Sequence, residues 1–171
     1  MRTSPVKVRT RRATPREWDV HEKAALHLWL HTWGGRILPM PKRDCFDAFW
    51  TDGKVLIGAL EVKLHTGLPG QTDSPEVLSM PVSKWGMAVW LAHFQITPYV
   101  IFVMQDRVLW QHVMEVHRFA IWTPREDIAN QAGQTVPEVI VSYLVRGMHE
   151  LSNQPLFTER SPGGTGYVVP G

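Results

Sequence analysis

Apolar residues recur at intervals of three and four between Trp18 and Thr32. This is the spacing of one face of an α-helix, so the pattern predicts a helix over this stretch. Gly34-Gly35 ends the periodic segment, as glycine commonly does after a helix. A short extended piece is expected over Arg36–Met40.

Two apolar runs then flank the tetrapeptide Thr51-Asp52-Gly53-Lys54. An Asp-Gly pair between such runs is a strong signal for a β-hairpin. We therefore expect Cys45–Trp50 and Val55–Leu64 to form antiparallel neighbours. The second run is apolar on both faces, which is typical of a central strand that is covered on both sides.

Residues 64–76 are rich in Gly, Pro, Thr and Asp, which predicts a loop. Further helices and strands are expected after it. The patterns predict a helix over Pro81–Phe94 with Ser79 as its cap, strands over Tyr99–Met104 and Val108–Val113, a helix start at Thr123, and an amphipathic helix over Val136–Leu151. The resulting order is α-β-β-α-β-β-α. It predicts a mixed α/β fold with a central mixed sheet flanked by helices.

Length and cysteine content narrow the class of protein. The chain has 171 residues, enough for one domain with its own core. Its single cysteine, Cys45, excludes an internal disulfide. That favours a reducing compartment, and we expect the cytoplasm of a bacterial, archaeal or phage-infected cell. The sequence shows no signal peptide and no apolar run long enough to span a bilayer, so no membrane association is expected.

Positive charge is concentrated near the N-terminus. The first sixteen residues contain no acid and six basic side chains: Arg2, Lys7, Arg9, Arg11, Arg12 and Arg16. We interpret residues 1–16 as a flexible basic arm suited to a polyanion such as nucleic acid. A solubilising tail is the alternative interpretation. The expected organisation is this arm, a folded domain over 17–155, and a flexible tail over 156–171.

The tripeptide Glu61-Val62-Lys63 carries the candidate chemistry. Residues two apart on a strand point to the same face, so Glu61 and Lys63 project together. Taken alone, the pair is explained by an ion pair at a strand end. A second carboxylate changes this, because Asp44 and Asp47 lie at the start of the partner strand, where it meets the end of the Glu61 strand.

The hairpin register decides which aspartate meets Glu61. A two-residue loop would set Asp44 opposite Glu61. A three-residue loop would place Asp47 diagonal to Glu61, and a five-residue loop would place Asp47 directly opposite. The sequence leaves these registers open.

Asp44-Cys45-Phe46-Asp47, a turn, and then Leu60-Glu61-Val62-Lys63 resemble the motif of the PD-(D/E)XK nuclease superfamily. This superfamily includes restriction endonucleases, Holliday-junction resolvases and phage nucleases. Its helix–strand–strand–helix–strand order also matches the order expected here over residues 18–113. The proline of the motif name is absent. The resemblance implies a restriction-endonuclease-like core.

The resemblance also implies roles for individual residues. Asp47, Glu61 and the backbone carbonyl of Val62 would hold Mg²⁺ or Mn²⁺. Lys63 would position or activate the attacking water and stabilise the charged phosphate. We prefer Asp47 to Asp44 because it leads directly into the apolar residues of its strand.

Several further residues are candidates for auxiliary roles. Asp44 would be an extra ligand or a strand cap, Glu22 would contribute from the first helix, and Lys84 would face the site or the DNA backbone. A solvent-facing charge is the alternative for Glu22 and for Lys84. Four arginines would contact nucleic acid: Arg9, Arg11, Arg12 and Arg16.

The function expected from this resemblance is that of a magnesium-dependent deoxyribonuclease, of phage type or junction-resolving. A resolvase would be a homodimer, since it cuts two strands symmetrically. The alternatives are a non-catalytic nucleic-acid-binding protein that keeps the fold, and a virion-associated protein in which the acid and the lysine form only a salt bridge. Endonuclease or exonuclease action and base preference stay open.

Overall fold

The computed structural model describes residues 15–41, 46–64, 76–104, 106–122, 138–154 and 156. Arg9, Arg11, Arg12, Asp44, the helix start expected at Thr123, and the tail beyond residue 156 lie outside these residues. The first helix, α1, spans Pro15–Trp33 and therefore includes Arg16, which we had placed in the basic arm. Among the described helices, none is long and apolar enough to cross a membrane.

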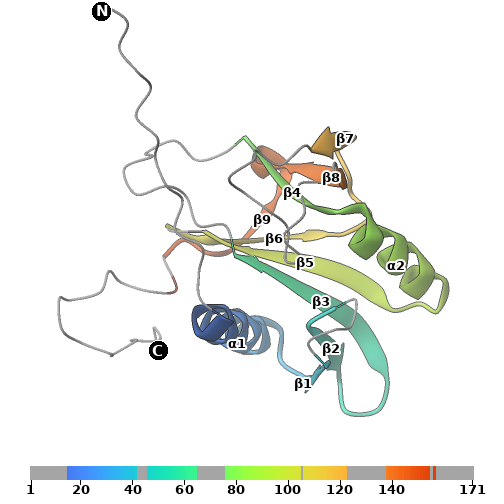
Figure 1. Ribbon diagram of the computed structural model, residues 1–171. Coiled ribbons are helices and arrows are strands. Elements are labelled where there is room, and N and C mark those ends of the chain that lie inside the picture. Colours follow the sequence, from blue (N-terminus) through green and yellow to red (C-terminus); the bar gives the residue numbers. More distant parts are fainter. Residues whose placement is uncertain are drawn as a thin grey trace, which may run out of the picture.

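A six-stranded mixed sheet forms the centre of the described structure, with the strand order β1-β2-β3-β5-β6-β9. Its strands are β1 (Arg36–Pro39), β2 (Ala48–Thr51), β3 (Leu56–Leu64), β5 (Thr97–Val103), β6 (Val108–His112) and β9 (His149–Ser152). Only β3 and β5 pair in parallel. Helix α2 (Val82–His93) lies in the connection between them (Figure 1). A parallel pair needs such a crossover, whereas antiparallel neighbours need only a turn.

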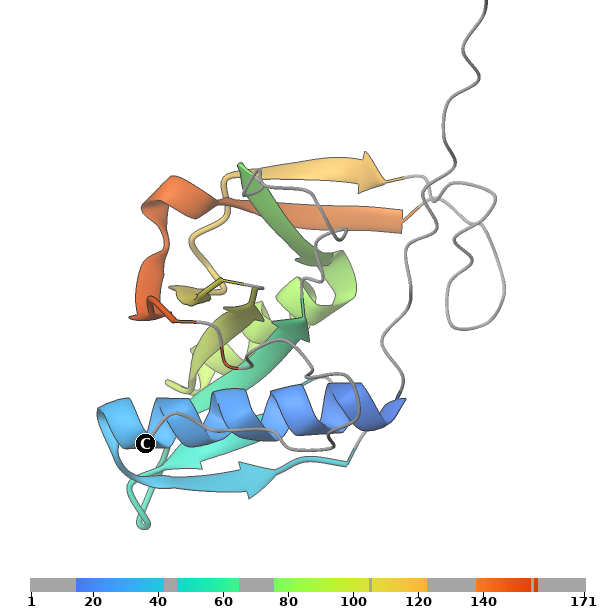
Figure 2. The same cartoon turned by 90° about the vertical axis from the view of Figure 1, so that its left-hand side faces the viewer.

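Helix α1 covers one face of this sheet (Figure 2). Trp29, which is 1% exposed, packs with other apolar side chains of α1 against Leu60 and Ile101 in a single buried cluster. The alternation of side chains along β3 sends Leu60 and Val62 to this cluster. Ala59 joins the cluster on the opposite face. Burial on both faces confirms β3 as a central strand.

The opposite face is covered by α2 and by a second, three-stranded sheet with the order β4-β8-β7. These strands are β4 (Val77–Pro81), β7 (Arg118–Trp122) and β8 (Glu138–Leu144). Met80 and Tyr143 from this sheet share a buried cluster with Val100 and Phe102 of β5. The described chain therefore has three layers, with the central sheet in the middle.

The helix expected over Val136–Leu151 is wrong. This segment contains β8, the short 3₁₀ helix η1 (Val145–Gly147) and β9. β8 is buried on both faces at its centre: Val141 and Tyr143 are fully buried, and Ser142 between them is 2% exposed. Its backbone pairs with β4 on one side and with β7 on the other. The α-β-β-α-β-β-α order is corrected accordingly, while the central mixed sheet flanked by helices is confirmed.

Two smaller corrections concern the second sheet. Neither β4 nor β7 was expected from the sequence. Ser79 does not cap α2: it pairs with Ser142 inside the sheet. Pro81 takes the cap position of α2, without a side-chain hydrogen bond.

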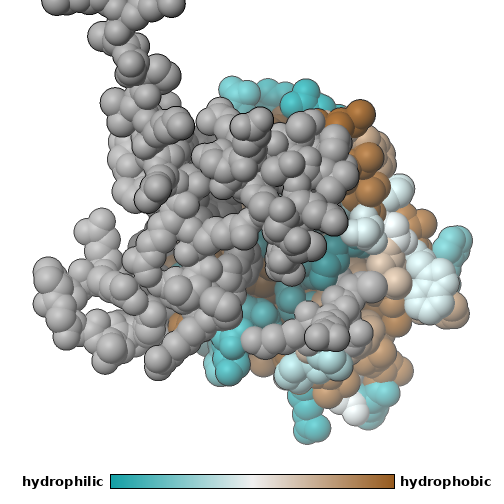
Figure 3. All heavy atoms as spheres, viewed as in Figure 1, coloured by the Kyte–Doolittle hydropathy of each residue, from teal (hydrophilic) through white to brown (hydrophobic). Residues whose placement is uncertain are grey.

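The described surface is hydrophobic on the side formed by α2 and β7 (Figure 3). Trp90 of α2 is 56% exposed, Phe94 at the C-terminal cap of this helix is 60% exposed, and Ile121 of β7 is 75% exposed. Apolar groups do not attract phosphate. This side of the molecule is therefore not expected to bind a phosphate group.

Candidate active site

The register of the β2–β3 hairpin brings Asp47 to Glu61. Ala48 pairs with Leu60, so one further step along both strands sets Asp47 across from Glu61. The backbone N–H of Asp47 still donates to the Leu60 carbonyl at 3.0 Å. This is the register expected from a five-residue loop.

The register arises from a shorter turn combined with an irregularity. Thr51 pairs with Leu56, and the pairing shifts between Trp50 and Thr51. The hydroxyl of Thr51 donates to the Val55 carbonyl at 2.6 Å, and a carboxylate oxygen of Asp52 accepts the N–H groups of Lys54 and Val55. A bulge of this kind adds one residue to one strand and shifts every later pair.

Asp47 is held by a backbone hydrogen bond at the end of this ladder. Its Oδ2 accepts the N–H of Val62 at 2.6 Å. Val62 lies beyond the last β2–β3 pair, so its N–H has no strand carbonyl opposite it in β2. A buried N–H needs a partner, and the carboxylate of Asp47 supplies it.

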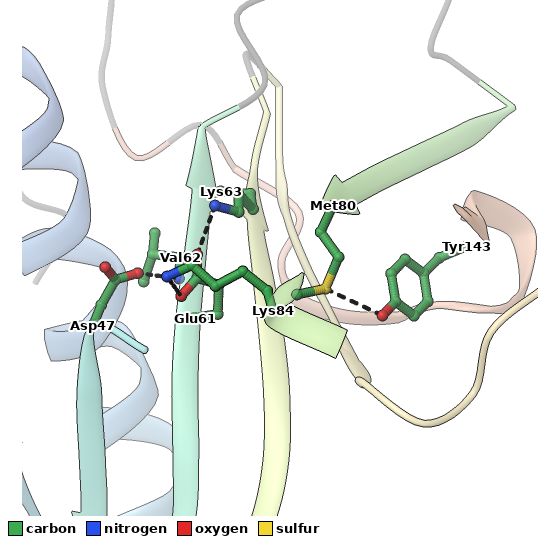
Figure 4. Close-up of polar contacts among 7 residues, drawn as sticks. All are labelled: Asp47, Glu61, Val62, Lys63, Met80, Lys84 and Tyr143. Carbon is green, nitrogen blue, oxygen red and sulfur yellow. Dashed lines mark hydrogen bonds and ion pairs between the residues drawn. The ribbon is translucent and has the colours of Figure 1, made fainter. Parts of the chain in front are cut away.

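Glu61 of β3 is buried and forms two ion pairs (Figure 4). It is 1% exposed. Its Oε1 lies 2.6 Å from Nζ of Lys63 on the same strand, and its Oε2 lies 3.0 Å from Nζ of Lys84 on α2. Both lysine side chains keep about a quarter of their surface exposed, at 26% and 23%. A buried carboxylate is tolerated only with such partners.

Asp47 lies in surroundings that disfavour its charged form. Burial, and next the charge of Glu61, raise the pKa of Asp47 to about 6. The Val62 N–H and the ammonium of Lys84 act in the opposite direction. Asp47 therefore carries negative charge that its described neighbours compensate only in part.

Glu22 of α1 also acts on this site. Its charge is among those that raise the pKa of Asp47. The helix thus brings a third acid near the pair. Asp44 lies outside the described residues, and so does most of the basic arm.

The side chains present suit a hard divalent cation. Two carboxylates offer oxygen ligands, and the partly compensated charge of Asp47 is what a bound cation would offset. Among the described residues, no group of three or more His, Cys, Asp or Glu side chains could hold a metal ion. Such a site would therefore need backbone carbonyl and water ligands as well, which is the usual coordination of Mg²⁺ in proteins.

The site thus gathers Asp47, Glu61, Lys63 and Lys84 from β2, β3 and α2. Sequence patterns predicted the first three together. The pairing of Lys84 with Glu61 was not predicted, because it depends on how α2 packs over β3. The one feature of the sequence that pointed to Lys84 was its position in the first turn of α2, the helix that leads into the next strand of the central sheet.

No protein-family model matches the sequence, and no curated protein matches it significantly. Among solved structures, the chain is similar to Archaeoglobus fulgidus Hjc, a Holliday junction resolvase from an archaeal hyperthermophile. The match has 15% sequence identity and a TM-score of 0.46, and it covers 75% of this chain and 84% of that chain.

Proposed function

We propose that this chain is a magnesium-dependent nuclease that hydrolyses phosphodiester bonds in DNA. One observation carries the proposal: Asp47 and Glu61 meet at the end of the β2–β3 hairpin, with the ammonium of Lys63 2.6 Å from Glu61. Two acids and a lysine at one point match what phosphodiester hydrolysis requires. The reaction needs an activated water and compensation for the negative charge that develops on the phosphate.

Each residue takes a role from its position. The carboxylates of Asp47 and Glu61, together with the Val62 carbonyl, would hold Mg²⁺ or Mn²⁺. When bound, the ion would lower the pKa of a ligand water and neutralise phosphate charge. The ammonium of Lys63 would orient the water and bind a phosphate oxygen, and it remains partly accessible for this at 26% exposure. Glu22 and Asp44 would add negative charge near the ion.

The substrate and setting follow from the same proposal. DNA would be contacted by the arginines of residues 1–16, which lie largely outside the described residues. A junction-resolving or phage-type enzyme of the cytoplasm, active as a homodimer, is the form we propose. A dimer would place two such sites on two strands.

The test is cleavage of supercoiled plasmid and of a four-way junction in Mg²⁺ or Mn²⁺. We expect the native chain to cut and the Lys63→Ala and Glu61→Ala variants to lose at least about a hundredfold in rate, as removal of a transition-state contact typically does. Lys54→Ala is the matched control, because Lys54 is exposed in the turn at the opposite end of the hairpin. Cutting that persists in both site variants would contradict the proposal.

A non-catalytic DNA-binding protein is the second candidate. It is favoured by one observation, that both oxygens of Glu61 already pair with ammonium groups. In that case the cluster would only neutralise a buried acid. DNA binding by the native chain without cleavage in either metal, and without measurable Mn²⁺ binding, would support this candidate over the nuclease.

A further inference from the structure

Glu61 connects two elements through its two oxygens. Lys63 reaches Oε1 from two residues further along β3, whereas Lys84 reaches Oε2 from the first turn of α2 (Figure 4). Both carboxylate oxygens of Glu61 are therefore paired with ammonium groups of the protein itself.

The two lysines are not equivalent. The position of Lys63 is set by the strand that also carries Glu61, and its ion pair is the shorter, at 2.6 Å against 3.0 Å. Lys84 reaches the same acid from a separate element, the first turn of α2. Asp47 and Glu61 are the two side chains that would hold a divalent ion.

A lysine and a divalent ion would therefore compete for the same negative charge. A cation bound by Asp47 and Glu61 removes most of the attraction that keeps the Lys84 ammonium at Oε2, because two like charges then face each other at short range. Lys84 has a four-carbon stem with rotatable bonds, and its side chain is 23% exposed, so the ammonium can turn toward solvent without unfolding α2.

We propose that Lys84 fills the charge of the metal site in the metal-free protein and is released by the divalent ion to bind a phosphodiester oxygen of the substrate. The inference rests on the proposed function and adds an ordered coupling to it. Metal binding exposes a phosphate ligand, and phosphate binding by Lys84 in turn removes a competitor of the metal. By linkage, the ion and the phosphodiester then raise each other's affinity by the same factor.

The direct test follows the lysine ammonium groups of the full-length, metal-free protein by ¹⁵N nuclear magnetic resonance. Ammonium groups held in ion pairs give signals that exposed lysines do not. Lys63→Arg and Lys84→Arg variants assign the two signals. We expect the Lys84 signal to disappear on saturation with Mg²⁺, the Lys63 signal to remain, and the Lys84 signal to return at a new position when a cleavage-resistant phosphorothioate oligonucleotide is added.

A calorimetric titration with Mg²⁺ alone gives a second readout. Lys84→Met should raise the affinity for Mg²⁺ on the order of tenfold, because the competing cation is gone. Lys54→Met, which removes an exposed lysine in the turn, should leave the affinity unchanged. The same Lys84→Met variant should lose the increase in oligonucleotide affinity that Mg²⁺ confers on the native chain.

The outcomes separate this inference from the proposed function. Side-chain carboxyl groups are followed by ¹³C resonance in the same titration. If Mg²⁺ shifts the carboxyl signals of Asp47 and Glu61 while the Lys84 signal stays unchanged, the inference is wrong and the metal site stands. If Lys84→Met binds Mg²⁺ no more tightly than the native chain, the inference is also wrong. If Mg²⁺ shifts neither carboxyl signal, the metal-dependent nuclease itself is contradicted.

Discussion

The backbone N–H of Val62 donates a 2.6 Å hydrogen bond to Oδ2 of Asp47. Asp47 lies one residue past Ala48, whose pair with Leu60 is the last of the β2–β3 ladder. The carboxylate thus completes the hairpin and at the same time lies beside Glu61. Fold and candidate site share this contact. Substitutions at Asp47 should therefore distinguish its contribution to stability, through the Val62 hydrogen bond, from its contribution to metal binding.

Replacing Asp47 by Asn or by Ala makes that separation. Asn keeps an oxygen that can accept the Val62 N–H, whereas Ala leaves this N–H without a partner. An unsatisfied buried N–H costs about 1–3 kcal/mol, so Asp47→Ala should be less stable than Asp47→Asn by that amount. Urea unfolding at neutral pH measures the difference, and both variants should lose Mn²⁺ binding. Equal stability of the two variants would show that the hydrogen bond contributes nothing.

Removing the charge of Glu61 while both lysines remain should lower the free energy of unfolding. Glu61→Gln leaves two ammonium groups next to a buried amide, and we expect a loss of about 2–4 kcal/mol in the free energy of unfolding. The double variant Glu61→Gln/Lys84→Met removes one of the stranded charges and should recover part of that loss. Urea unfolding of the native chain, both single variants and the double variant gives the coupling energy. Strict additivity would mean that the Glu61–Lys84 contact is energetically irrelevant.

The metal-free protein should lose stability as the pH rises from 4 to above 6. The pKa of Asp47 moves from 3.8, its ordinary value, to about 6 in the folded chain, mainly through burial. The folded state therefore holds this proton more tightly, and the resulting stabilisation, present below pH 4, is lost as the pH rises through 6. A shift of this size corresponds to at most about 3 kcal/mol.

Other groups titrate in the same window, so the measured quantity is a difference. The free energy of unfolding of Asp47→Asn minus that of the native chain should grow between pH 4 and pH 7 in a metal chelator. Added Mg²⁺ should reduce this difference at pH 7, because the ion binds only the ionised carboxylate. A difference that is flat with pH would contradict the raised pKa.

Two adjacent glycines after α1 should respond differently to alanine. Both have positive φ, at +71° for Gly34 and +86° for Gly35. A Cβ at Gly35 would lie 2.6 Å from the Thr51 carbonyl and from Nε1 of Trp50, whereas a Cβ at Gly34 meets nothing within 4 Å. Gly34→Ala should therefore cost about 1 kcal/mol for the backbone conformation alone.

Gly35→Ala should cost at least about 2 kcal/mol more, because it also pushes β1 and α1 away from β2. Thermal unfolding of the two variants measures the difference. Similar midpoints for both would mean that the contact between residue 35 and β2 relaxes easily.

Local patterns in the sequence determined a large part of this protein. The helical spacing of α1, the Asp52-Gly53 turn and the apolar run of β3 are signals that act over a few residues. They were enough to predict the central hairpin, helix α2 and the strands β5 and β6. The period of two along β3 was also enough to place Glu61 and Lys63 on one face.

Only the tertiary structure decided the remainder. The bulge between Trp50 and Thr51 sets the register, and one added residue determines whether Asp47 meets Glu61. The segment over Glu138–Leu144 has apolar residues that fit either a helix or a strand. It becomes a strand because its backbone pairs with β4 and β7, which lie far away in the sequence. Lys84 reaches Glu61 for the same reason: the contact is made by the packing of α2 over β3, which no pattern within either segment contains.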